Sequence, residues 1–367
     1  VDTAKIFSVL KELGTYKNFS KLLSNYLVLF KSSPFSLDSL PVSEDAQYGK
    51  ARTKLFHRIF KWIYKKYCSV LEADKTIDFA DMIRDAIKIV KQDDFHDKTQ
   101  NAFRFKYIMV DEFQDISPLR SELIRSLKAS SQRCAFFCVG DDWQAIYRFT
   151  GSDVGLTTNY AEYFGKTHSV YLDKTFRFNN KIEEVASAFV QANDSQLKKQ
   201  LVTHTISERT EVHVIPCAKE DVLIDILNRI NAESTPGSTV LVLSRFNKSL
   251  KKVRKLAVKH KKLSIKYMSA HASKGKQADY VIILDVIDGK YGFPSKVMTD
   301  PLLETLLPRL ETFAYAEERR LFYVAMSRAK KSVFIHTVLG KESIFIKELK
   351  NKGFDVEFDV TTLSDLL

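Results

Sequence analysis

Residues 105–142 read "FKYIMVDEFQDISPLRSELIRSLKASSQRCAFFCVGDD" and contain two short apolar runs, each ending in acidic residues. The runs "FKYIMV" and "CAFFCVG" have the length of strands, whereas "LRSELIRSL" between them has helical spacing. Apolar strands that alternate with helices are typical of a parallel sheet covered on both faces. This stretch therefore predicts an α/β fold.

The same alternation resumes after residue 200, with strands predicted in "EVHVIPC", "STVLVLS", "DYVIILDV" and "SVFIHTV" and a helix in "EDVLIDILNRINA". Residues 1 to about 72 have helical patterns instead. We expect two α/β units preceded by a helical segment, with boundaries at 1–74, 75–174 and 175–367.

Three helices are predicted near the N-terminus, in "TAKIFSVLKELG", "KARTKLFHRIFKWIYKKYCSVLEA" and "DFADMIRDAIKIVKQ". The second has a basic outer face. The predicted apolar faces are Ile6, Leu10 and Leu13 in the first helix and Leu55, Ile59, Ile63 and Tyr67 in the second.

The chain has 367 residues, which is enough for roughly two or three domains. Its net charge of +12 favours a polyanionic partner, most often nucleic acid, although a basic soluble protein without such a partner fits too. No apolar run approaches the roughly 18 residues that cross a bilayer, and the four cysteines form no CxxC pair. We expect a cytoplasmic protein without a membrane partner.

The first predicted strand delivers Asp111 and Glu112 side by side at its carboxyl end, "YIMVDEFQD". Ligands of open α/β sheets bind at that edge. Asp111 can hold Mg²⁺, and Glu112 can orient and deprotonate an attacking water. The alternative is a pair of exposed turn acids.

The stretch "FCVGDDWQAIYRFTG", residues 137–151, joins acids, an amide and aromatic rings in one loop. Gln144 could contact a γ-phosphate. Tyr147 and Phe149 would share a face if the segment is extended, which makes a stacking platform for unpaired bases. The alternative is that both rings are buried in a core.

Further basic residues flank predicted strands. Phe176 and Arg177 follow the predicted strand "SVYLD", and we expect Arg319, Arg320 and Arg328 to lie on one helix, "EERRLFYVAMSRAKK". An arginine at a domain edge can stabilise a transferring phosphoryl group, but each could equally be a surface residue in a salt bridge. The turn "SAHASKGKQADYVIIL" offers His271, Ser273, Lys274 and Gly275 for binding DNA phosphate or for coupling two sites.

Taken together and in this order, these segments resemble the superfamily 1A helicases of the UvrD/Rep type, and especially the helicase IV branch. "VDEFQD" resembles the Walker B motif II, "GDDWQAIYRFTGSD" motif III, "TFRFNNKI" motif IV, "HASKGKQADYVIILDV" motif V and "EERRLFYVAMSRAKK" motif VI. The resemblance runs from about residue 75 to 340. It implies two RecA-like domains, 1A and 2A, with residues 1–74 as a helical 1B-like segment.

The resemblance also implies roles for single residues. Asp111 would serve Mg²⁺, Glu112 would be the catalytic base, and Gln144 would link the γ-phosphate of ATP to DNA. The remaining implied roles are adenine stacking for Phe176, arginine fingers for Arg177 and Arg328, nucleotide contact for Gly275 and Gln277, and DNA binding for Tyr147, Phe149, His271 and Lys274.

The sequence departs from the family pattern in three places. No G-x-x-x-x-G-K-[ST] occurs, because Ala51 and Glu342 follow two of the Gly-Lys pairs, so we expect a fragment that lacks the phosphate-binding loop and is inactive alone. Gln277 stands where many relatives carry a glutamate. The 93 residues between Arg177 and His271 (271 − 177 − 1) are too few for the large 2B insertion.

The resemblance implies an ATP-dependent 3′→5′ DNA helicase that acts on single-stranded DNA and on duplexes with a 3′ single-stranded tail, with the missing N-terminal part of the same protein as partner. One alternative is a helicase-like ATPase that remodels RNA polymerase or another nucleoprotein machine. A helicase–nuclease is disfavoured because only about 37 residues follow Lys330 (367 − 330).

Two basic segments leave their role open. "RFNKSLKKVRKLAVKHKK" would align Phe246, Leu250, Val253 and Ala257 on one face of a helix over 247–262, with lysines outside. It is either a track for DNA phosphates or a solvated face; if it is a track, neutralising Lys251, Lys252 and Lys255 should flatten the salt dependence of DNA binding. Arg58, Lys61, Lys65 and Lys66 pose the same alternative in the N-terminal helices.

Overall fold

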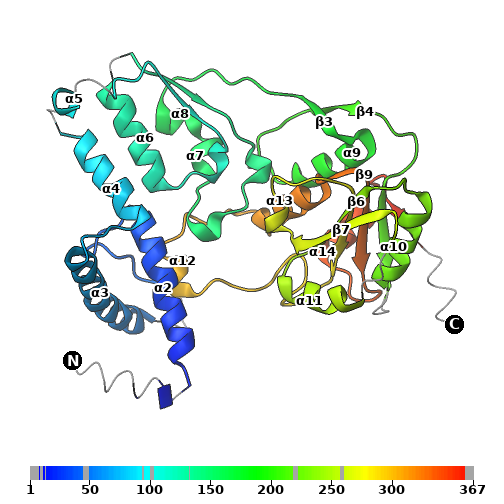
Figure 1. Ribbon diagram of the computed structural model, residues 1–367, viewed down its shortest axis with the longest axis horizontal. Coiled ribbons are helices and arrows are strands. Elements are labelled where there is room, and N and C mark those ends of the chain that lie inside the picture. The colour runs from blue at the N-terminus through cyan, green and yellow to red at the C-terminus, as the bar shows by residue number, and fades with distance from the viewer. Residues whose placement is uncertain are drawn as a thin grey trace. The chain divides into compact units, whose positions relative to one another are not determined.

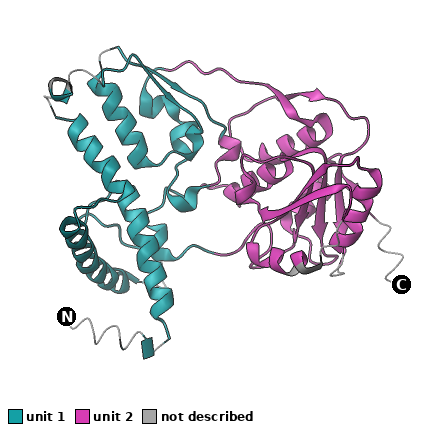
Figure 2. Ribbon diagram, in the orientation of Figure 1, with its two compact units in different colours: residues 1–141, 147–166, 298–310 teal, residues 142–146, 167–297, 311–367 magenta. Residues whose placement is uncertain are grey.

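The computed structural model describes residues 8, 11–12, 14–43, 49–92, 95–99, 103–131, 133–217, 222–256 and 260–359 (Figure 1). The chain forms two compact units (Figure 2). Unit 1 comprises residues 1–141, 147–166 and 298–310, and unit 2 comprises residues 142–146, 167–297 and 311–367. The predicted division at residues 74 and 174 into family subdomains stays a prediction.

Unit 2 contains a six-stranded parallel sheet with the order β10-β5-β9-β8-β6-β7. All four strands predicted after residue 200 are present in it. The strands are β5 (Val212–Pro216), β6 (Ser238–Ser244), β7 (Leu263–Ser269), β8 (Ala278–Leu284), β9 (Ala329–Thr337) and β10 (Glu357–Phe358).

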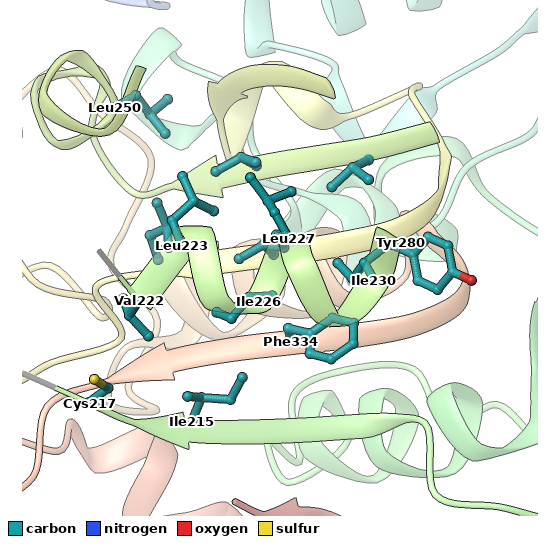
Figure 3. Close-up of a cluster of buried hydrophobic side chains, with 14 residues drawn as sticks. Ile215, Cys217, Val222, Leu223, Ile226, Leu227, Ile230, Leu250, Tyr280 and Phe334 are labelled. Carbon is teal, nitrogen blue, oxygen red and sulfur yellow. The ribbon is translucent and has the colours of Figure 1, made fainter. Parts of the chain in front are cut away.

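Helices cover both faces of this sheet, as near-continuous apolar strands require. Figure 3 shows one face, where side chains of α10 (Val222–Glu233) and Leu250 of α11 (Asn247–Leu256) pack against strand residues such as Ile215, Tyr280 and Phe334. Leu241 and Leu243 of β6 point to the opposite face of the sheet and are also buried. On this opposite face lie α9 (Asn180–Val190), α13 (Ala316–Met326) and α14 (Ile344–Asn351), which contact one another through the rings of Phe189, Phe322 and Phe345.

A second, two-stranded parallel sheet in unit 2 pairs β3 (Lys174–Asn179) with β4 (Val202–Thr205). The expectation of a strand at residues 169–173 is wrong. The ladder begins where Lys174 pairs with Val202, and residues 169–173 have no regular secondary structure. Apolar composition predicted a strand there, but a strand exists only where a neighbour supplies backbone partners. Phe176 and Arg177 therefore lie within the strand instead of after it.

Unit 1 contains a two-stranded parallel sheet, β1 (Tyr107–Val110) and β2 (Ala135–Cys138), connected by α6 (Pro118–Ser130). One face packs on a core of Phe113, Ile116, Leu156 and Phe164 with α7 (Gly155–Thr158) and α8 (Tyr160–Phe164). On the other face Tyr107, Met109 and Phe137 have exposed fractions of 71, 75 and 61%. Both strands were predicted, and the α/β class with parallel sheets is confirmed.

The helical part of unit 1 consists of α2 (Tyr16–Ser32), α3 (Gly49–Ala73), α4 (Phe79–Val90), the short α5 (Phe95–Lys98) and α12 (Pro301–Glu304). The helix at α3 was predicted, and Ile59, Ile63 and Tyr67 of its predicted apolar face are half-buried, but its fully buried residues were not predicted. Leu55 is exposed, whereas Phe56 and Phe60 pack edge-on against Tyr26 at 4.9 and 4.7 Å between ring centroids. Aromatic rings four residues apart bury more area than the aliphatic residues beside them, so they took the core face.

The helix α4 agrees with its prediction and begins with Asp78, whose carboxylate accepts hydrogen bonds from the amides of Ala80 and Asp81. The buried ammonium of Lys31 pairs with Asp78 at 2.5 Å and with Asp81 at 2.6 Å, which ties α2 to α4. Ile6, Leu10 and Leu13, the apolar face of the predicted first helix, lie outside the described residues. Among the residues that are described, none of the helices combines the length and apolar character needed to span a membrane.

Candidate nucleotide-binding and DNA-binding residues

Asp111 and Glu112 directly follow β1 in unit 1, at the sheet edge where they were expected, and both are exposed. Glu112 has a left-handed backbone with φ 49°, and its amide donates to Asp111 Oδ1 at 2.8 Å. A non-glycine residue in this region costs of order 1–3 kcal/mol, and such strain is concentrated at functional sites. The turn thus holds two carboxylates beyond the end of the strand.

Gln114, for which no role was predicted, organises this turn. Its Nε2 donates to Glu112 Oε2 at 2.5 Å, and its Oε1 accepts from the amide of Asp141 at 2.9 Å. A Cβ on Gly140 would lie 2.8 Å from Gln114 Oε1, so only glycine leaves room for the amide there. Gln114 therefore joins the ends of β1 and β2 and fixes the Glu112 carboxylate.

The oxygen donors of Asp111 and Glu112 are of the type that Mg²⁺ prefers. In the described part of the chain no group of three or more His, Cys, Asp and Glu side chains could hold a metal ion. Mg²⁺ is commonly bound through one or two carboxylates with phosphates and water, not by an all-protein cage. The donor set at this turn fits that mode of binding.

The segment 142–146 belongs to unit 2, although both of its neighbours in the sequence belong to unit 1. It opens with a 3₁₀ turn, η2 (Asp142–Gln144). The buried Asp142 carboxylate accepts from Gln196 Nε2 at 2.5 Å and from the Leu197 amide at 2.9 Å, and it pairs with Lys199 at 2.5 Å. The indole of Trp143 donates to the Leu197 carbonyl at 3.0 Å. Asp142 is thus an anchor inside unit 2.

Gln144 brings three predicted site residues together within unit 2. Lys274 Nζ donates to the Gln144 carbonyl at 3.0 Å, and Arg328 Nη2 donates to Gln144 Oε1 at 3.4 Å. The next carbonyl, of Ala145, accepts from Arg320 Nε at 2.6 Å. One short segment therefore contacts a predicted arginine finger and a predicted DNA-binding lysine.

The arginines of the last motif are not arranged as expected. Arg319 and Arg320 lie on α13, but the helix ends at Met326 and Arg328 stands in the turn before β9. Arg328 is only 1% exposed and donates to the Val324 carbonyl and to Ser327 Oγ at 2.8 and 2.9 Å. Because the chain must reverse into a strand within three residues, the helical pattern could not continue to Arg328.

Arg319 and Arg320 are also buried, so the alternative of surface salt bridges is wrong for both. Arg319 pairs with Glu348 at 2.7 Å and Arg320 with Glu311 at 2.6 Å. Arg320 Nη1 also donates to Gln196 Oε1 at 2.9 Å, which connects it to the Asp142 anchor. Neither Gln196 nor Glu311 carried a recognisable sequence signal.

The turn before β8 contains η4 (His271–Ser273), with Lys274, Gly275 and Gln277 after it. Burial, reinforced by the charge of Arg245, lowers the pKa of His271 to about 4, although its hydrogen bond to the Ile146 backbone opposes the shift. Gly275 has φ +75°, and Gly275 and Gln277 are exposed. His271 is therefore a neutral ring at neutral pH, joined to the segment that carries Gln144.

Phe176 lies on β3 with 70% of its surface exposed. One neighbour is the His204 ring, with centroids 5.1 Å apart, and another is the Lys174 ammonium at 5.5 Å. Arg177, the next residue on the strand, is half-buried. An exposed ring beside a cation is suited to a planar, anionic ligand.

Tyr147 and Phe149 belong to unit 1, but not to the extended segment that was expected. Arg148–Thr150 forms a 3₁₀ turn, η3, pinned by hydrogen bonds from Arg148 to Glu304 and to the Pro308 carbonyl. The two rings nevertheless lie 6.1 Å apart at 64°, and Phe149 is 52% exposed. Burial and the charges of Asp115 and Glu112 raise the pKa of Tyr147, so this ring lies near the predicted catalytic base.

A Gly-Lys-Thr sequence also stands at residues 165–167, where no site was predicted. Tyr160 occupies the position of the first glycine of a phosphate-binding loop, and the triplet follows the helix α8. A phosphate-binding loop instead leads from a strand into a helix. This triplet therefore does not supply the missing motif.

Two family models match the chain in the regions that form these sites. The UvrD/REP helicase N-terminal domain matches residues 9–165, and the UvrD-like helicase C-terminal domain matches residues 227–339. The chain therefore belongs to the UvrD/Rep family of helicases.

Individual relatives agree with this assignment. The chain is 40% identical to DNA helicase IV of Escherichia coli over 290 residues, which cover 79% of this chain and 41% of that protein. It is 27% identical to the ATP-dependent DNA helicase PcrA of Leuconostoc citreum over 157 residues, or 42% of this chain and 20% of the relative. The ATP-dependent DNA helicase Rep of Salmonella typhimurium is 27% identical over 165 residues, or 45% of this chain and 24% of the relative. The chain thus spans less than half the length of these relatives.

Proposed function

We propose that the protein containing this chain is an ATP-dependent DNA helicase that moves 3′→5′ along single-stranded DNA. The observation that carries the proposal is the position of Gln144, hydrogen-bonded to Arg328 and to Lys274 within unit 2. A residue whose side chain is bonded to an arginine assigned to phosphate, and whose carbonyl is bonded to a lysine assigned to DNA, can transmit a change at one ligand to the other. The family membership and the excess of positive charge support the same function.

The proposed chemistry divides between the two units. In unit 1 Glu112, oriented by Gln114, accepts a proton from the attacking water, and Asp111 takes part in holding Mg²⁺. In unit 2 Phe176 stacks on adenine, while Arg177 and Arg328 neutralise charge on the γ-phosphate. Bound Mg²⁺·ATP supplies the phosphoanhydride bond whose cleavage drives movement. Gly275 and Gln277 are assigned to the nucleotide site only on the family pattern.

DNA binding is assigned to Tyr147, Phe149, His271 and Lys274. The two rings are stacking partners for unpaired bases, each worth about 1–3 kcal/mol. The substrate we propose is single-stranded DNA or a duplex with a 3′ single-stranded tail. We also propose that the protein acts in the cytoplasm.

We further propose that another segment of the same protein supplies the phosphate-binding loop. The exposed face of β1 and β2 supports this proposal, because parallel sheets have both faces covered and Tyr107, Met109 and Phe137 are not. The relatives are more than twice as long as the matched region, which is consistent with a further segment.

The full-length protein tests the function through Glu112→Gln. This variant should lower the kcat of DNA-stimulated ATP hydrolysis by about 100-fold or more, with DNA affinity unchanged, because it removes only the base. Glu162→Gln, at an exposed acid on α8, is the matched control and should leave kcat unchanged.

The unmodified enzyme should unwind a duplex with a 3′ tail and leave one with a 5′ tail intact. Normal ATP turnover by Glu112→Gln would contradict the catalytic assignment. Unwinding from the 5′ tail would contradict the polarity.

A further inference from the structure

Tyr291 is an exposed aromatic residue held on a rigid loop of unit 2. Its side chain is 64% exposed, while Phe293, two residues later, is fully buried against Phe322 with ring centroids 5.3 Å apart. A Cβ on Gly292 would lie 1.9 Å from the Ile287 carbonyl oxygen, so the backbone of this loop is closely packed. The loop is anchored on both sides of a ring that points away from the core.

A second ring, from a different part of the chain, lies against Tyr291. Phe246 follows β6 and meets Tyr291 edge-on, with ring centroids 5.7 Å apart and an interplanar angle of 83°. Phe246 was predicted to share a helix face with Leu250, Val253 and Ala257, and this prediction is wrong for Phe246, which precedes the helix. α11 begins at Asn247, and Leu250 and Val253 pack in the core, whereas Ala257 lies outside the described residues.

One carboxylate fixes both segments that carry these rings. Glu318 accepts from Arg245 at 2.7 Å and from the Ser295 amide at 2.9 Å. The Arg245 guanidinium in turn lies 4.7 Å from the centre of the Phe246 ring. The spacing of the aromatic pair is thus set by buried and half-buried groups, so it exists before any ligand binds.

The surroundings of the pair are positively charged. Lys290 lies 5.9 Å from the Tyr291 ring centre, and Lys248 and Lys251 are exposed on α11 close after Phe246. Two carboxylates of these segments are paired, Glu318 with Arg245 and Asp288 with Lys296 at 2.5 Å. Rings flanked by exposed lysines suit a chain of stacked bases with phosphates between them.

We propose that Phe246 and Tyr291 form a second base-stacking site for single-stranded DNA, with Lys290 and Lys248 binding the adjacent phosphates. The inference rests on the proposed function, since it adds a DNA contact in unit 2 to those already assigned. Arg245 also places this site near His271, which is already assigned to DNA binding. The charge of Arg245 acts on His271, so the two residues lie near each other.

The test measures binding of a fluorescent oligo(dT) to the full-length protein without nucleotide. Tyr291→Ala should weaken binding about 5- to 100-fold, the equivalent of about 1–3 kcal/mol for one stacked base. Tyr291→Phe keeps the ring and should bind as the unmodified protein does. On an oligonucleotide of abasic sites, Tyr291→Ala and the unmodified protein should bind equally.

Photocrosslinking gives an independent measurement. An oligonucleotide containing 5-iodouracil should crosslink to the peptide that contains Tyr291. If the unmodified protein binds oligo(dT) but Tyr291→Ala binds equally well and no crosslink forms there, the stacking site is overturned and the helicase proposal stands. If the unmodified protein does not bind oligo(dT), both proposals fail.

Discussion

His271 makes a single-residue prediction about pH. Its pKa of about 4 in the folded protein lies below the ordinary value of 6.5 because the ring is buried and faces Arg245. Between these pH values the unfolded chain binds more protons than the folded chain, so stability falls as pH is lowered from 6.5 to 4. When the pH is lowered from 6.5 to 4, we expect the free energy of unfolding to fall by about 3 kcal/mol less in His271→Gln than in the unmodified chain.

Chemical denaturation at several pH values measures this difference. His57 and His213 also have lowered pKa values, but their contribution is common to both proteins and cancels in the comparison. His168→Gln, at an exposed position, is the control substitution. Parallel curves for His271→Gln and the unmodified chain would show that the ring is not held neutral by the fold.

At this scale the sequence predicted the positions of Asp111 and Glu112, because their place at a strand end follows from the apolar run before them. It did not predict Gln114, because the role of that amide depends on a hydrogen bond to Asp141 on the next strand. Arg320 was noted, but its partners Gln196 and Glu311 were not. Such partners are brought together only by tertiary folding, so the local spacing of residues does not predict them.

Among the elements, the segment 142–146 is bonded to unit 2 along its whole length. Asp142 binds Gln196 and Lys199, Gln144 binds Lys274 and Arg328, and Ala145 binds Arg320. Arg320 is central, because its guanidinium joins this segment to both Gln196 and Glu311. A buried planar fork cannot be replaced by an ammonium without losing some of these bonds.

We therefore expect Arg320→Lys in the full-length protein to reduce the stimulation of ATP hydrolysis by DNA about 5- to 10-fold. The reason is that Gln144 loses its fixed position, which weakens the coupling between the nucleotide and DNA sites. The measurement is the ratio of kcat with and without single-stranded DNA. This ratio does not change if the substitution merely lowers the amount of folded enzyme.

Arg319→Lys is the matched control for this element. Arg319 is equally buried and donates to the Phe189 carbonyl and to Glu348, so its substitution should cost comparable stability. The DNA stimulation ratio of Arg319→Lys should stay near that of the unmodified enzyme. Equal DNA stimulation ratios for the two variants would show that Arg320 does not position Gln144.

Most helices and strands followed from apolar periodicity, and the exceptions have a common cause. The strand expected at residues 169–173 begins later because pairing with β4 starts at Lys174, and α3 buries Phe56 instead of Leu55 because of Tyr26. The helix expected to include Arg328 ends early because β9 must begin at Ala329. In each case a neighbour distant in the sequence decided between local alternatives.

At the scale of the whole molecule, the sheets of the two units differ in how many of their faces are covered. The six-stranded sheet of unit 2 is covered on both faces by described helices, whereas Tyr107, Met109 and Phe137 leave one face of the unit 1 sheet exposed. Apolar patches of this kind commonly mark interaction sites. This difference is the structural basis for proposing that unit 1 is completed by another segment of the same protein.

The corresponding prediction concerns the 367-residue chain alone. It should hydrolyse ATP only marginally and bind ATP weakly, even with single-stranded DNA, because its sequence contains no G-x-x-x-x-G-K-[ST]. Addition of the proposed N-terminal segment as a separate polypeptide should restore DNA-stimulated hydrolysis, since that segment would supply the loop and cover β1 and β2. Met109→Lys places a charge on the exposed face and should block this restoration, whereas Ile89→Lys, at an exposed position of α4, should not. Vigorous hydrolysis by the chain alone would mean that the phosphate-binding function is already contained in these residues.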